Sequence, residues 1–318
     1  MSELKKIIDK TQKVAIFCHE NPDGDAIGSM LGLGNLLEKL GKEVFYFSPD
    51  KPSKTFSFLK GFEKIKNTFD YGYYNLFIFV DFSEYARIKT IYRGKEKYFS
   101  ENQILVFDHH QMLNPPQNRT IISDTESTST CEIILENTLN IWEEYYDKEI
   151  ATCLYLGLTT DSGNFRYDKN HERILKNALI LIQLGADKKL VIDNFINNKT
   201  LGTINFLKTL LNRVNIEGEI LYSYYDVDEL KDYDIDNEQA SYGLTILQEI
   251  SGPKITMTIR KEDDLVKVSL RSKDTNVEKI AKNFGGGGHI HASGFTQTIK
   301  KNFNITKKEI IKKVQTLL

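Results

Sequence analysis

The fold follows from residues 14–40, which read VAIFCHENPDGDAIGSMLGLGNLLEKL. The first five residues form a continuous apolar run, which is typical of a strand buried in a parallel sheet. A turn at 21–24 (NPDG) leads into 26–40, where apolar residues recur at helical spacing until Gly41 ends the helix. Because a second apolar run follows at 44–47, we expect a β-α-β unit and a sheet that is mainly parallel.

The same patterns continue along the chain and predict an α/β protein. In the N-terminal part we expect strands at 76–80 and 104–107, and helices at 130–139, 150–157 and 171–184. In the C-terminal part we expect strands at 219–225, 254–260, 265–270 and 292–295, and helices at 238–250, 277–284 and 307–318. The sequence thus predicts a domain at 1–185 with flanking helices, a helical connector at 186–215 and a smaller α/β domain at 216–318.

The composition is that of an ordinary globular protein. Of the 318 residues, 40% are hydrophobic and 27% are charged, and the net charge of −2 argues against a protein that coats nucleic-acid duplexes. We find no apolar leader and no apolar run of about 20 residues, so we expect no signal peptide and no membrane span. The cysteines Cys18, Cys131 and Cys153 are scattered, which is typical of reduced thiols in a cytoplasmic protein.

Histidines and carboxylates gather in short clusters, which contain four of the six histidines. The clusters are 19–25 (HENPDGD), Asp81, 108–110 (DHH), 161–163 (DSG) and 285–289 (GGGGH). We expect each of the first four to follow a strand-like run. Because the carboxyl ends of strands in an open α/β sheet meet at one crevice, these four clusters predict a shared site.

The first cluster places His19, Asp23 and Asp25 within seven residues of one another. Carboxylates two residues apart on a tight turn can face two different cations, although the cluster alone is also compatible with an ordinary acidic loop. Asp81 ends a strongly apolar run. Alone it could be a helix N-cap or a turn residue, but beside other acids it is suited to bridge two cations.

The third and fourth clusters add two imidazoles and another carboxylate. His109 and His110 are adjacent after an apolar run, so their side chains point in different directions and one can bind metal while the other faces substrate. Asp108 can orient an imidazole ring, as carboxylates often do beside metal-binding histidines. Asp161 would supply a further carboxylate ligand.

These residues together predict a site for two divalent cations. The expected ligands are His19, Asp23, Asp25, Asp81, His109 and Asp161. Four carboxylates carry too much charge to gather without cations, and mixed ligands suit Mn²⁺ better than an all-oxygen Mg²⁺ site, while Zn²⁺ or Co²⁺ could substitute. Two cations about 3.5–4 Å apart would activate a water for phosphoryl displacement. His110 could then protonate the leaving oxygen or stabilise the charge of the phosphoryl group.

The glycine-rich cluster at 285–289 joins a predicted helix to a predicted strand. Glycines leave backbone N–H groups free to approach an anion closely. His289 can donate a hydrogen bond to a phosphate, and Arg271 can bind one bidentately. The alternative is a flexible linker, but ordered sequence resumes at 292–295, so we expect a phosphate-binding element.

The residues quoted above resemble a known family. Residues 19–29 (HENPDGDAIGS), with 108–110, are strongly similar to the DHH phosphoesterases. Residues 271–273 (RSK) and the pattern GGGGHxxAxG at 285–294 resemble the C-terminal domain that accompanies them. The length and domain order are similar to the nano-RNase and pAp-phosphatase branch, whose members hydrolyse very short oligonucleotides and 3′-phosphoadenosine-5′-phosphate (pAp).

The resemblance implies a role for each site residue. His19, Asp23 and Asp81 would hold one Mn²⁺, and Asp25, Asp81, His109 and Asp161 would hold the other. His110 would lie near the scissile phosphate, and Asp108 would support a ligand without binding metal. Arg271, Ser272, Gly286, Gly287, Gly288 and His289 would bind the far phosphate and base. The active site would then lie in the cleft between the two domains.

We therefore expect a Mn²⁺-dependent phosphodiesterase and phosphatase, with Mg²⁺ or Co²⁺ as alternative cations. Its substrates would be short RNA or DNA, pApA and pAp. The alternatives are a cyclic-dinucleotide phosphodiesterase, a RecJ-type single-strand exonuclease, a manganese pyrophosphatase and a catalytically silent nucleotide sensor. An exposed edge strand could also support a homodimer.

Overall fold

The computed structural model describes residues 3–82, 85–111, 119–167 and 170–318. The chain divides into two compact units, Met1–Asn198 and Lys199–Leu318. The boundary between the units falls inside the segment 186–215, for which the sequence predicts a helical connector. In the described ranges, no helix is both long enough and apolar enough to cross a membrane.

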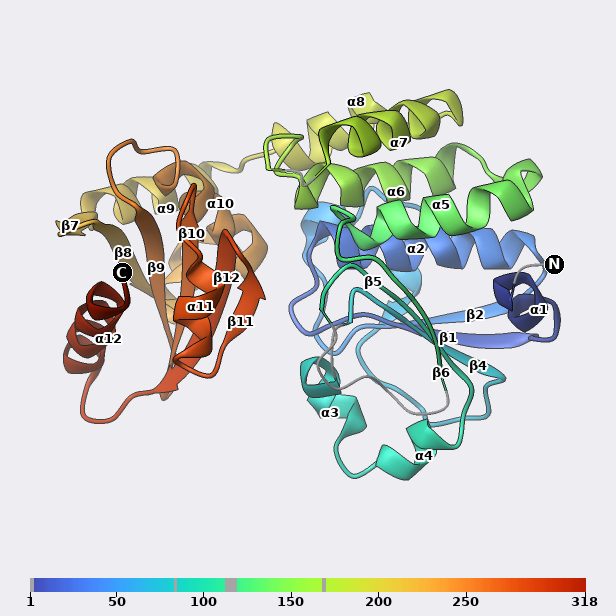
Figure 1. Ribbon diagram of the computed structural model, residues 1–318, viewed down its shortest axis with the longest axis horizontal. Helices are drawn as coiled ribbons and strands as arrows, with labels where there is room; N and C mark the ends of the chain where they lie inside the picture. Colours follow the sequence, from blue (N-terminus) through green and yellow to red (C-terminus); the bar gives the residue numbers. More distant parts are fainter. Residues whose placement is uncertain (1–2, 83–84, 112–118, 168–169) are drawn as a thin grey trace. The chain divides into compact units, whose positions relative to one another are not determined.

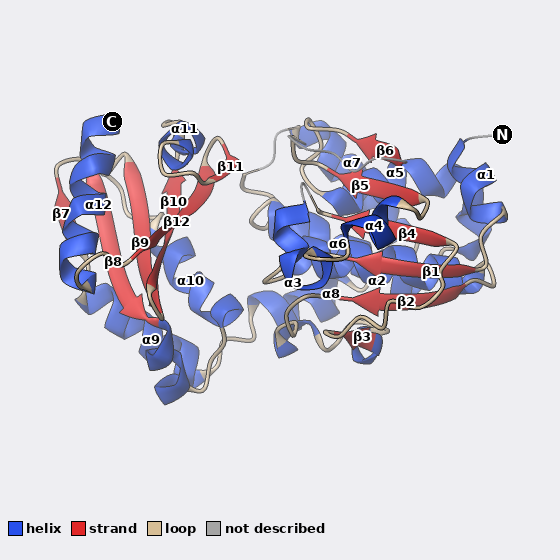
Figure 2. Cartoon of the chain, turned by 90° about the horizontal axis from the view of Figure 1, so that it is seen from below, coloured by secondary structure: helices blue, strands red, loops and turns tan. Residues whose placement is uncertain are grey.

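The first unit is built on a six-stranded sheet in the order β3-β2-β1-β4-β5-β6, seen in Figure 2. Every neighbouring pair in this sheet is parallel, which confirms the predicted parallel sheet. The strands are β1 (Lys13–Phe17), β2 (Glu43–Phe47), β3 (Ile65–Lys66), β4 (Leu76–Val80), β5 (Ile104–Asp108) and β6 (Arg119–Ser123).

Helices cover both faces of this sheet, as the α/β class requires (Figure 1). The α-helices are α1 (Glu3–Asp9), α2 (Gly24–Lys39), α3 (Lys89–Tyr92), α4 (Glu96–Ser100), α5 (Thr130–Trp142), α6 (Lys148–Asp161), α7 (His171–Gln183) and α8 (Lys188–Val191). Short 3₁₀-helices lie at Lys54–Phe56, Phe62–Lys64, Tyr85–Ile88 and Glu143–Tyr145, and a π-helix at Ile192–Ile196 follows α8.

Alternate residues of β1 enter two different cores, because successive side chains of a strand point to opposite faces. Val14 and Ile16 pack with α2, α5 and α6. Ala15 and Phe17 enter an aromatic core on the other face with Phe77 and residues of α3 and α4. Residues 14–17 of the strand are therefore apolar on both faces, and the first polar cluster begins two residues after the strand ends.

The second unit has a mixed six-stranded sheet in the order β11-β12-β10-β9-β8-β7. Only the β8–β9 pair of this sheet is parallel. Its strands are β7 (Asn215–Glu217), β8 (Ile220–Asp226), β9 (Ile255–Glu262), β10 (Leu265–Ser272), β11 (Gly287–His289) and β12 (Ala292–Thr298). Its helices are α9 (Leu201–Asn212), α10 (Asn237–Leu247), α11 (Val277–Lys282) and α12 (Phe303–Leu317), with a 3₁₀-helix at Val227–Tyr233.

Some details differ from the expectations. The strands β3, β6, β7 and β11 were not predicted, because β3, β7 and β11 have only two or three residues and β6 is half-buried rather than a continuous buried run. Asp161 ends the helix α6, so the expectation that its cluster follows a strand is wrong. The apolar run before Asp161 belongs to the helix predicted at 150–157, which extends to Asp161 and packs along α2.

Candidate metal centre

The first cluster is shaped by the turn between β1 and α2. Asp23 is the N-cap of α2, and its Oδ1 accepts hydrogen bonds from the N–H groups of Asp25 (3.1 Å) and Ala26 (3.0 Å). Asn21 has a positive φ of 52°, which asparagine tolerates in a tight turn. The imidazole of His19 is fixed by a 2.7 Å hydrogen bond between its Nδ1 and the carbonyl of Glu20. The turn therefore presents His19 Nε2 beside the start of α2.

Asp81 lies at the centre of the site, immediately after β4. Its side chain is 2% exposed. The Oδ2 atom lies 3.1 Å from His19 Nε2, whereas Oδ1 lies 3.2 Å from His110 Nδ1 and 3.5 Å from His109 Nε2. The backbone is also unusual, because Asp81 has a φ of +52°. One carboxylate thus contacts three imidazoles that come from two strand ends.

The remaining acidic residues complete two groups of donor atoms. His19, Asp23 and Asp81 form one group, in which all ligand atoms lie within 4.8 Å of one another. Asp25, His109 and Asp161 form the other, with the same limit. His109 Nε2 lies 3.3 Å from Asp161 Oδ2 and 3.5 Å from Asp81 Oδ1, so Asp81 adjoins both groups. The structure therefore brings all six predicted ligands together.

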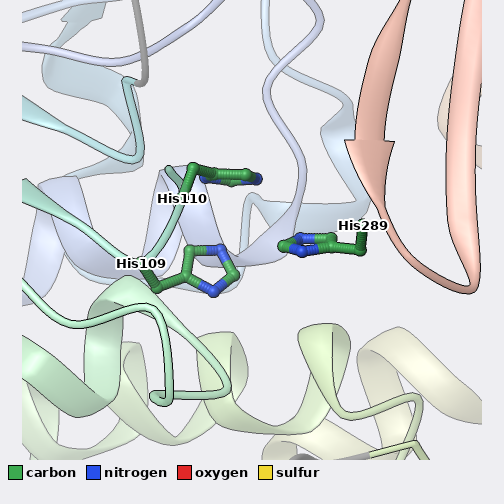
Figure 3. Close-up of side chains that lie close together, drawn as sticks. All are labelled: His109, His110 and His289. Carbon is green, nitrogen blue, oxygen red and sulfur yellow. The ribbon is translucent and has the colours of Figure 1, made fainter. Parts of the chain in front are cut away.

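The two histidines of the DHH cluster point in different directions, as the sequence predicts. Their rings lie 4.3 Å apart between centroids at an interplanar angle of 66° (Figure 3). His109 is buried, whereas the side chain of His110 is 20% exposed. Asp108 Oδ1 accepts a 2.9 Å hydrogen bond from the His110 backbone N–H and lies 2.9 Å from His110 Nδ1. Asp108 therefore orients the His110 ring.

Burial and neighbouring charges set the protonation of this site. Burial opposes the charge of His110, but hydrogen bonds with Asp108 and Asp81 outweigh it and raise the His110 pKa to about 10. Burial likewise raises the pKa of Asp81, yet its bonds with His109, His110 and His19 hold it well below its usual range. Burial and then the charge of Asp81 raise the pKa of Asp25 to about 6.

Asp25 is held by a contact that sequence reasoning missed. The N–H groups of Thr130 and Cys131, at the start of α5, donate to its Oδ2 (2.7 Å) and Oδ1 (3.0 Å). Gly157 of α6 leaves room for Asp25, since a Cβ there would lie 2.6 Å from Asp25 Oδ1. The signal available in the sequence was the run 127–130 (STST), because serine and threonine ahead of an apolar helix mark an N-cap.

In the second unit, β12 aligns two of the predicted substrate residues. Arg271 of β10 and His289 of β11 both pair with Ala292 of β12, from opposite sides. Directly paired residues of antiparallel strands share one face of the sheet. Ser272 follows Arg271 and donates its backbone N–H to the carbonyl of His291. This unit therefore carries a basic residue and a histidine on one face at the end of its sheet.

The glycine run does more than expose N–H groups. The N–H groups of Gly285 and Gly286 donate to Lys282 and Ala281 and so cap α11. A Cβ at Gly286 would lie 2.1 Å from the carbonyl oxygen of Gly294, so glycine is required there by close packing. Gly287 and Gly288 belong to β11 and pair with β12. The expectation of free N–H groups therefore does not hold for Gly285 and Gly286.

Three known proteins are similar to the chain over nearly its whole length. A "Bifunctional oligoribonuclease and PAP phosphatase NrnA" from Mycoplasma genitalium is 28% identical, covering 99% of this chain and 98% of that protein. The protein of the same name from Bacillus subtilis is 27% identical, covering 92% of each. An exopolyphosphatase-related protein from Bacteroides fragilis has a similar fold, with a TM-score of 0.86, 23% identity and coverage of 98% and 94%.

Two family descriptions match successive parts of the chain. "DHH family, N-terminal domain" matches residues 13–158, and "DHHA1 domain" matches residues 217–316. The first range contains β1 to β6 with most of the metal-binding candidates, and the second contains β8 to β12 of the mixed sheet. The resemblance predicted from the sequence is confirmed. The chain belongs to the DHH family of phosphoesterases and carries a DHHA1 domain in its second unit.

Proposed function

We propose that this phosphoesterase hydrolyses short oligonucleotides, including pApA, to mononucleotides and pAp to AMP. The observation that carries the proposal is the pair of donor groups that share Asp81 at the carboxyl ends of β1, β4 and β5. The activities for which the Mycoplasma genitalium and Bacillus subtilis relatives are named support the same substrates.

The donor set fits two divalent cations, with Mn²⁺ preferred and Mg²⁺ or Co²⁺ as alternatives. His19, Asp23 and Asp81 would hold one, and Asp25, Asp81, His109 and Asp161 would hold the other. Two observations support the fit. Four carboxylates and two imidazoles form two adjoining groups of donor atoms, and burial followed by the charge of Asp81 raises the pKa of Asp25. Mixed nitrogen and oxygen donors favour Mn²⁺ over Mg²⁺.

When bound, the two cations would activate a water and offset the charge of the phosphoryl group. The chain itself supplies the proton for the leaving oxygen. His110 is partly exposed and is oriented by Asp108. In the metal-free chain burial opposes its charge, but hydrogen bonds with Asp108 and Asp81 outweigh burial and raise its pKa to about 10. It can therefore donate a proton to the oxygen of the cleaved P–O bond.

The second unit would bind the far end of the nucleotide. Arg271 and His289 share one face of the β10-β12-β11 sheet, and both can donate hydrogen bonds to a phosphate. We assign Ser272, Gly286, Gly287 and Gly288 to the same binding element. Because the N–H of Gly286 is used by α11, its contribution would be to let the loop approach closely.

We also propose that the protein acts in the cytoplasm and can form a homodimer. Among the described residues, Cys18, Cys131 and Cys153 are free and buried, which supports a reducing compartment. Light scattering of the purified chain would measure the oligomeric state.

A side-by-side hydrolysis assay with Mn²⁺ tests the function. The substrates are pAp, pApA, a pentanucleotide RNA, a long single-stranded RNA, a cyclic dinucleotide and pyrophosphate. The control is a chain in which Asp108, His109 and His110 are all changed to alanine. We expect fast turnover only of pAp, pApA and the pentanucleotide, and none by the control.

Other outcomes would replace the proposal. Preference for the long RNA would indicate a RecJ-type exonuclease. Cleavage of the cyclic dinucleotide alone would indicate a cyclic-dinucleotide phosphodiesterase. Cleavage of pyrophosphate alone would indicate a manganese pyrophosphatase. Binding of nucleotides without any turnover would indicate a sensor. Repeating the assay with Mg²⁺ and Co²⁺ would test the preference for Mn²⁺.

A further inference from the structure

The segment that leads into α5 contains a dense group of buried polar side chains. Each is 5% exposed or less, and the group consists of Ser127, Thr128, Ser129, Thr130 and Glu132. Burying polar groups costs free energy unless they form hydrogen bonds. The hydrogen-bond partners of this segment therefore show which parts of the site it supports.

The first of these bonds connect α5 to a predicted metal ligand. The first N–H groups of an α-helix have no partner within the helix. Here the N–H groups of Thr130 and Cys131 donate to the two carboxylate oxygens of Asp25, at 2.7 and 3.0 Å. Asp25 lies 105 residues earlier and is fully buried. Both of its oxygens are therefore oriented by α5, and its charge is stabilised by the positive end of that helix.

The hydroxyl of Thr130 reaches the other side of the site. Its Oγ1 lies 3.5 Å from Oδ1 of Asp81 and can donate to it. The same Asp81 oxygen lies 3.2 Å from His110 Nδ1 and 3.5 Å from His109 Nε2. Thr130 thus contacts Asp25 through its backbone and Asp81 through its side chain. Changing either contact would alter the spacing between the two donor groups.

The position of Thr130 is itself fixed by Glu132. The Oε2 atom of Glu132 accepts hydrogen bonds from the Ser127 hydroxyl (2.8 Å) and the Thr128 N–H (2.9 Å). Its Oε1 accepts from Nδ2 of Asn177 in α7 (2.9 Å). The N-cap Ser129 accepts from the Glu132 N–H. Hydrogen bonds within residues 127–132 and to Asn177 of α7 therefore fix the start of α5, which contacts Asp25.

We propose that Thr130 is a positioning residue for the two-cation site, which sets the geometry between Asp25 and the shared Asp81. This inference rests on the proposed two-cation function. It predicts that removing the Thr130 hydroxyl lowers the affinity for the cation at Asp25, His109 and Asp161. The affinity for the cation at His19 and Asp23 should fall less.

The test compares Thr130→Val, Thr130→Ser and Thr138→Val in the full chain. Thr130→Val keeps the shape and the N–H but removes the hydroxyl, and Thr130→Ser restores it. Thr138 is the matched control, because it is a buried threonine of α5 whose hydroxyl bonds Ile134 and Tyr146 instead. Mn²⁺ is titrated and followed by electron paramagnetic resonance, which counts bound ions and reports spin coupling between two adjacent ions.

We expect wild type to bind two coupled ions. Thr130→Val should bind the second ion roughly ten-fold more weakly, with reduced spin coupling, as is typical when a group that supports metal ligands is removed. Thr130→Ser and Thr138→Val should behave as wild type. Thermal unfolding of the metal-free proteins measures any loss of stability separately, and in turnover the Thr130→Val change should lower kcat more than it raises KM.

The inference is overturned if Thr130→Val binds both ions as wild type does. It is also overturned if Thr130→Ser is as weak as Thr130→Val, or if Thr138→Val has the same effect, because the cause would then be the helix rather than the hydroxyl. A wild-type chain that binds fewer than two Mn²⁺ ions would instead remove the proposed function, and this inference with it.

Discussion

At the scale of single residues, Asp81 combines an unusual backbone with the most crowded side chain of the site. Its φ of +52° is disfavoured for a residue with a Cβ, and its N–H donates to the carbonyl of Phe107 in the neighbouring strand. Such conformations cost about 1–3 kcal/mol and are found mainly where the surroundings require them. The backbone of Asp81 is thus held in a position that turns its carboxylate toward the three imidazoles.

We predict that Asp81→Ala lowers turnover by more than about a hundred-fold, because both donor groups lose the shared carboxylate. Asp81→Gly should lose turnover equally but unfold at a higher denaturant concentration than Asp81→Ala. Glycine adopts a positive φ without the cost of about 1 kcal/mol that alanine incurs. Steady-state kinetics and urea unfolding measure the two effects, with Asp193→Ala as a control in the same unit. Turnover near wild type in either variant would contradict the role of Asp81.

Asp25 predicts a specific pH dependence of stability. Burial and the charge of Asp81 raise its pKa from 3.8 to about 6, so the folded state binds the proton more tightly than the unfolded state. The resulting stabilisation is complete below pH 3.8 and is lost as the pH rises through about 6. Asp25→Asn cannot titrate. In metal-free protein, the free energy of unfolding of wild type relative to Asp25→Asn should therefore fall by about 1 kcal/mol between pH 5 and pH 7.

Urea unfolding of both proteins at the two pH values, after treatment with a chelator, measures this difference. Titrating groups that do not interact with Asp25 cancel because they are common to the two chains, whereas Asp81, Asp23 and His109 interact with Asp25 and contribute to the difference. If the free energy of unfolding of wild type relative to Asp25→Asn is constant with pH, or grows toward pH 7, the prediction is wrong. The folded state would then not disfavour the ionised form of Asp25. Adding Mn²⁺ should remove the pH dependence, since the cation favours the ionised carboxylate.

At the scale of secondary-structure elements, the close contact between α2 and α6 decides whether Asp25 fits. A Cβ on Gly28 of α2 would lie 2.5 Å from the carbonyl oxygen of Cys153 in α6. A Cβ on Gly157 of α6 would lie 2.2 Å from Cys131 Sγ and 2.6 Å from Asp25 Oδ1. Two glycines therefore let these helices pack tightly enough for Asp25 to reach the start of α5.

We predict that Gly157→Ala destabilises the protein by about 1–3 kcal/mol, because the added methyl group overlaps buried atoms. It should also weaken Mn²⁺ binding, since one of the displaced atoms belongs to Asp25. The double variant Gly157→Ala with Cys131→Ala relieves the overlap with sulfur alone. It should regain part of the stability but not the Mn²⁺ affinity. Urea unfolding and Mn²⁺ titration measure the two quantities, and full recovery of both would show that Asp25 is unaffected.

At the scale of the whole molecule, the candidate functions are divided between two units. The metal-binding candidates belong to Met1–Asn198, and the substrate-binding candidates belong to Lys199–Leu318. Each unit has its own sheet and its own hydrophobic core. Substitutions in one unit should therefore affect one function and spare the other.

We predict that Arg271→Ala weakens binding of pAp by about 1–3 kcal/mol, because a charged hydrogen bond to phosphate is lost. Mn²⁺ binding should be unchanged. The control is Lys267→Ala, which removes a basic residue from the same face of β10, where it pairs with Glu262. Isothermal titration with pAp and with Mn²⁺ measures both affinities. Loss of Mn²⁺ binding in Arg271→Ala, or equal loss of pAp binding in both variants, would contradict this division of roles.

Much of this arrangement is determined by the sequence alone. The apolar run at 14–18, the turn that follows it and the helical spacing to Leu40 predict the first β-α-β unit, and the structure has it as β1, α2 and β2. The clusters at the ends of β1, β4 and β5 follow from the same pattern, because parallel strands bring their carboxyl ends together. Local patterns suffice for these clusters, because the position of each cluster residue is set by the strand that it follows.

Other features were decided only by the tertiary structure. Thr130 and Cys131 bind a carboxylate 105 and 106 residues earlier, and Gly157 makes room for it from a third helix. The physical reason is that these partners lie on different elements, and the periodicity of one segment carries no information about what packs against it. The caps that Gly285 and Gly286 form on α11 are different, because they bond the helix directly before them.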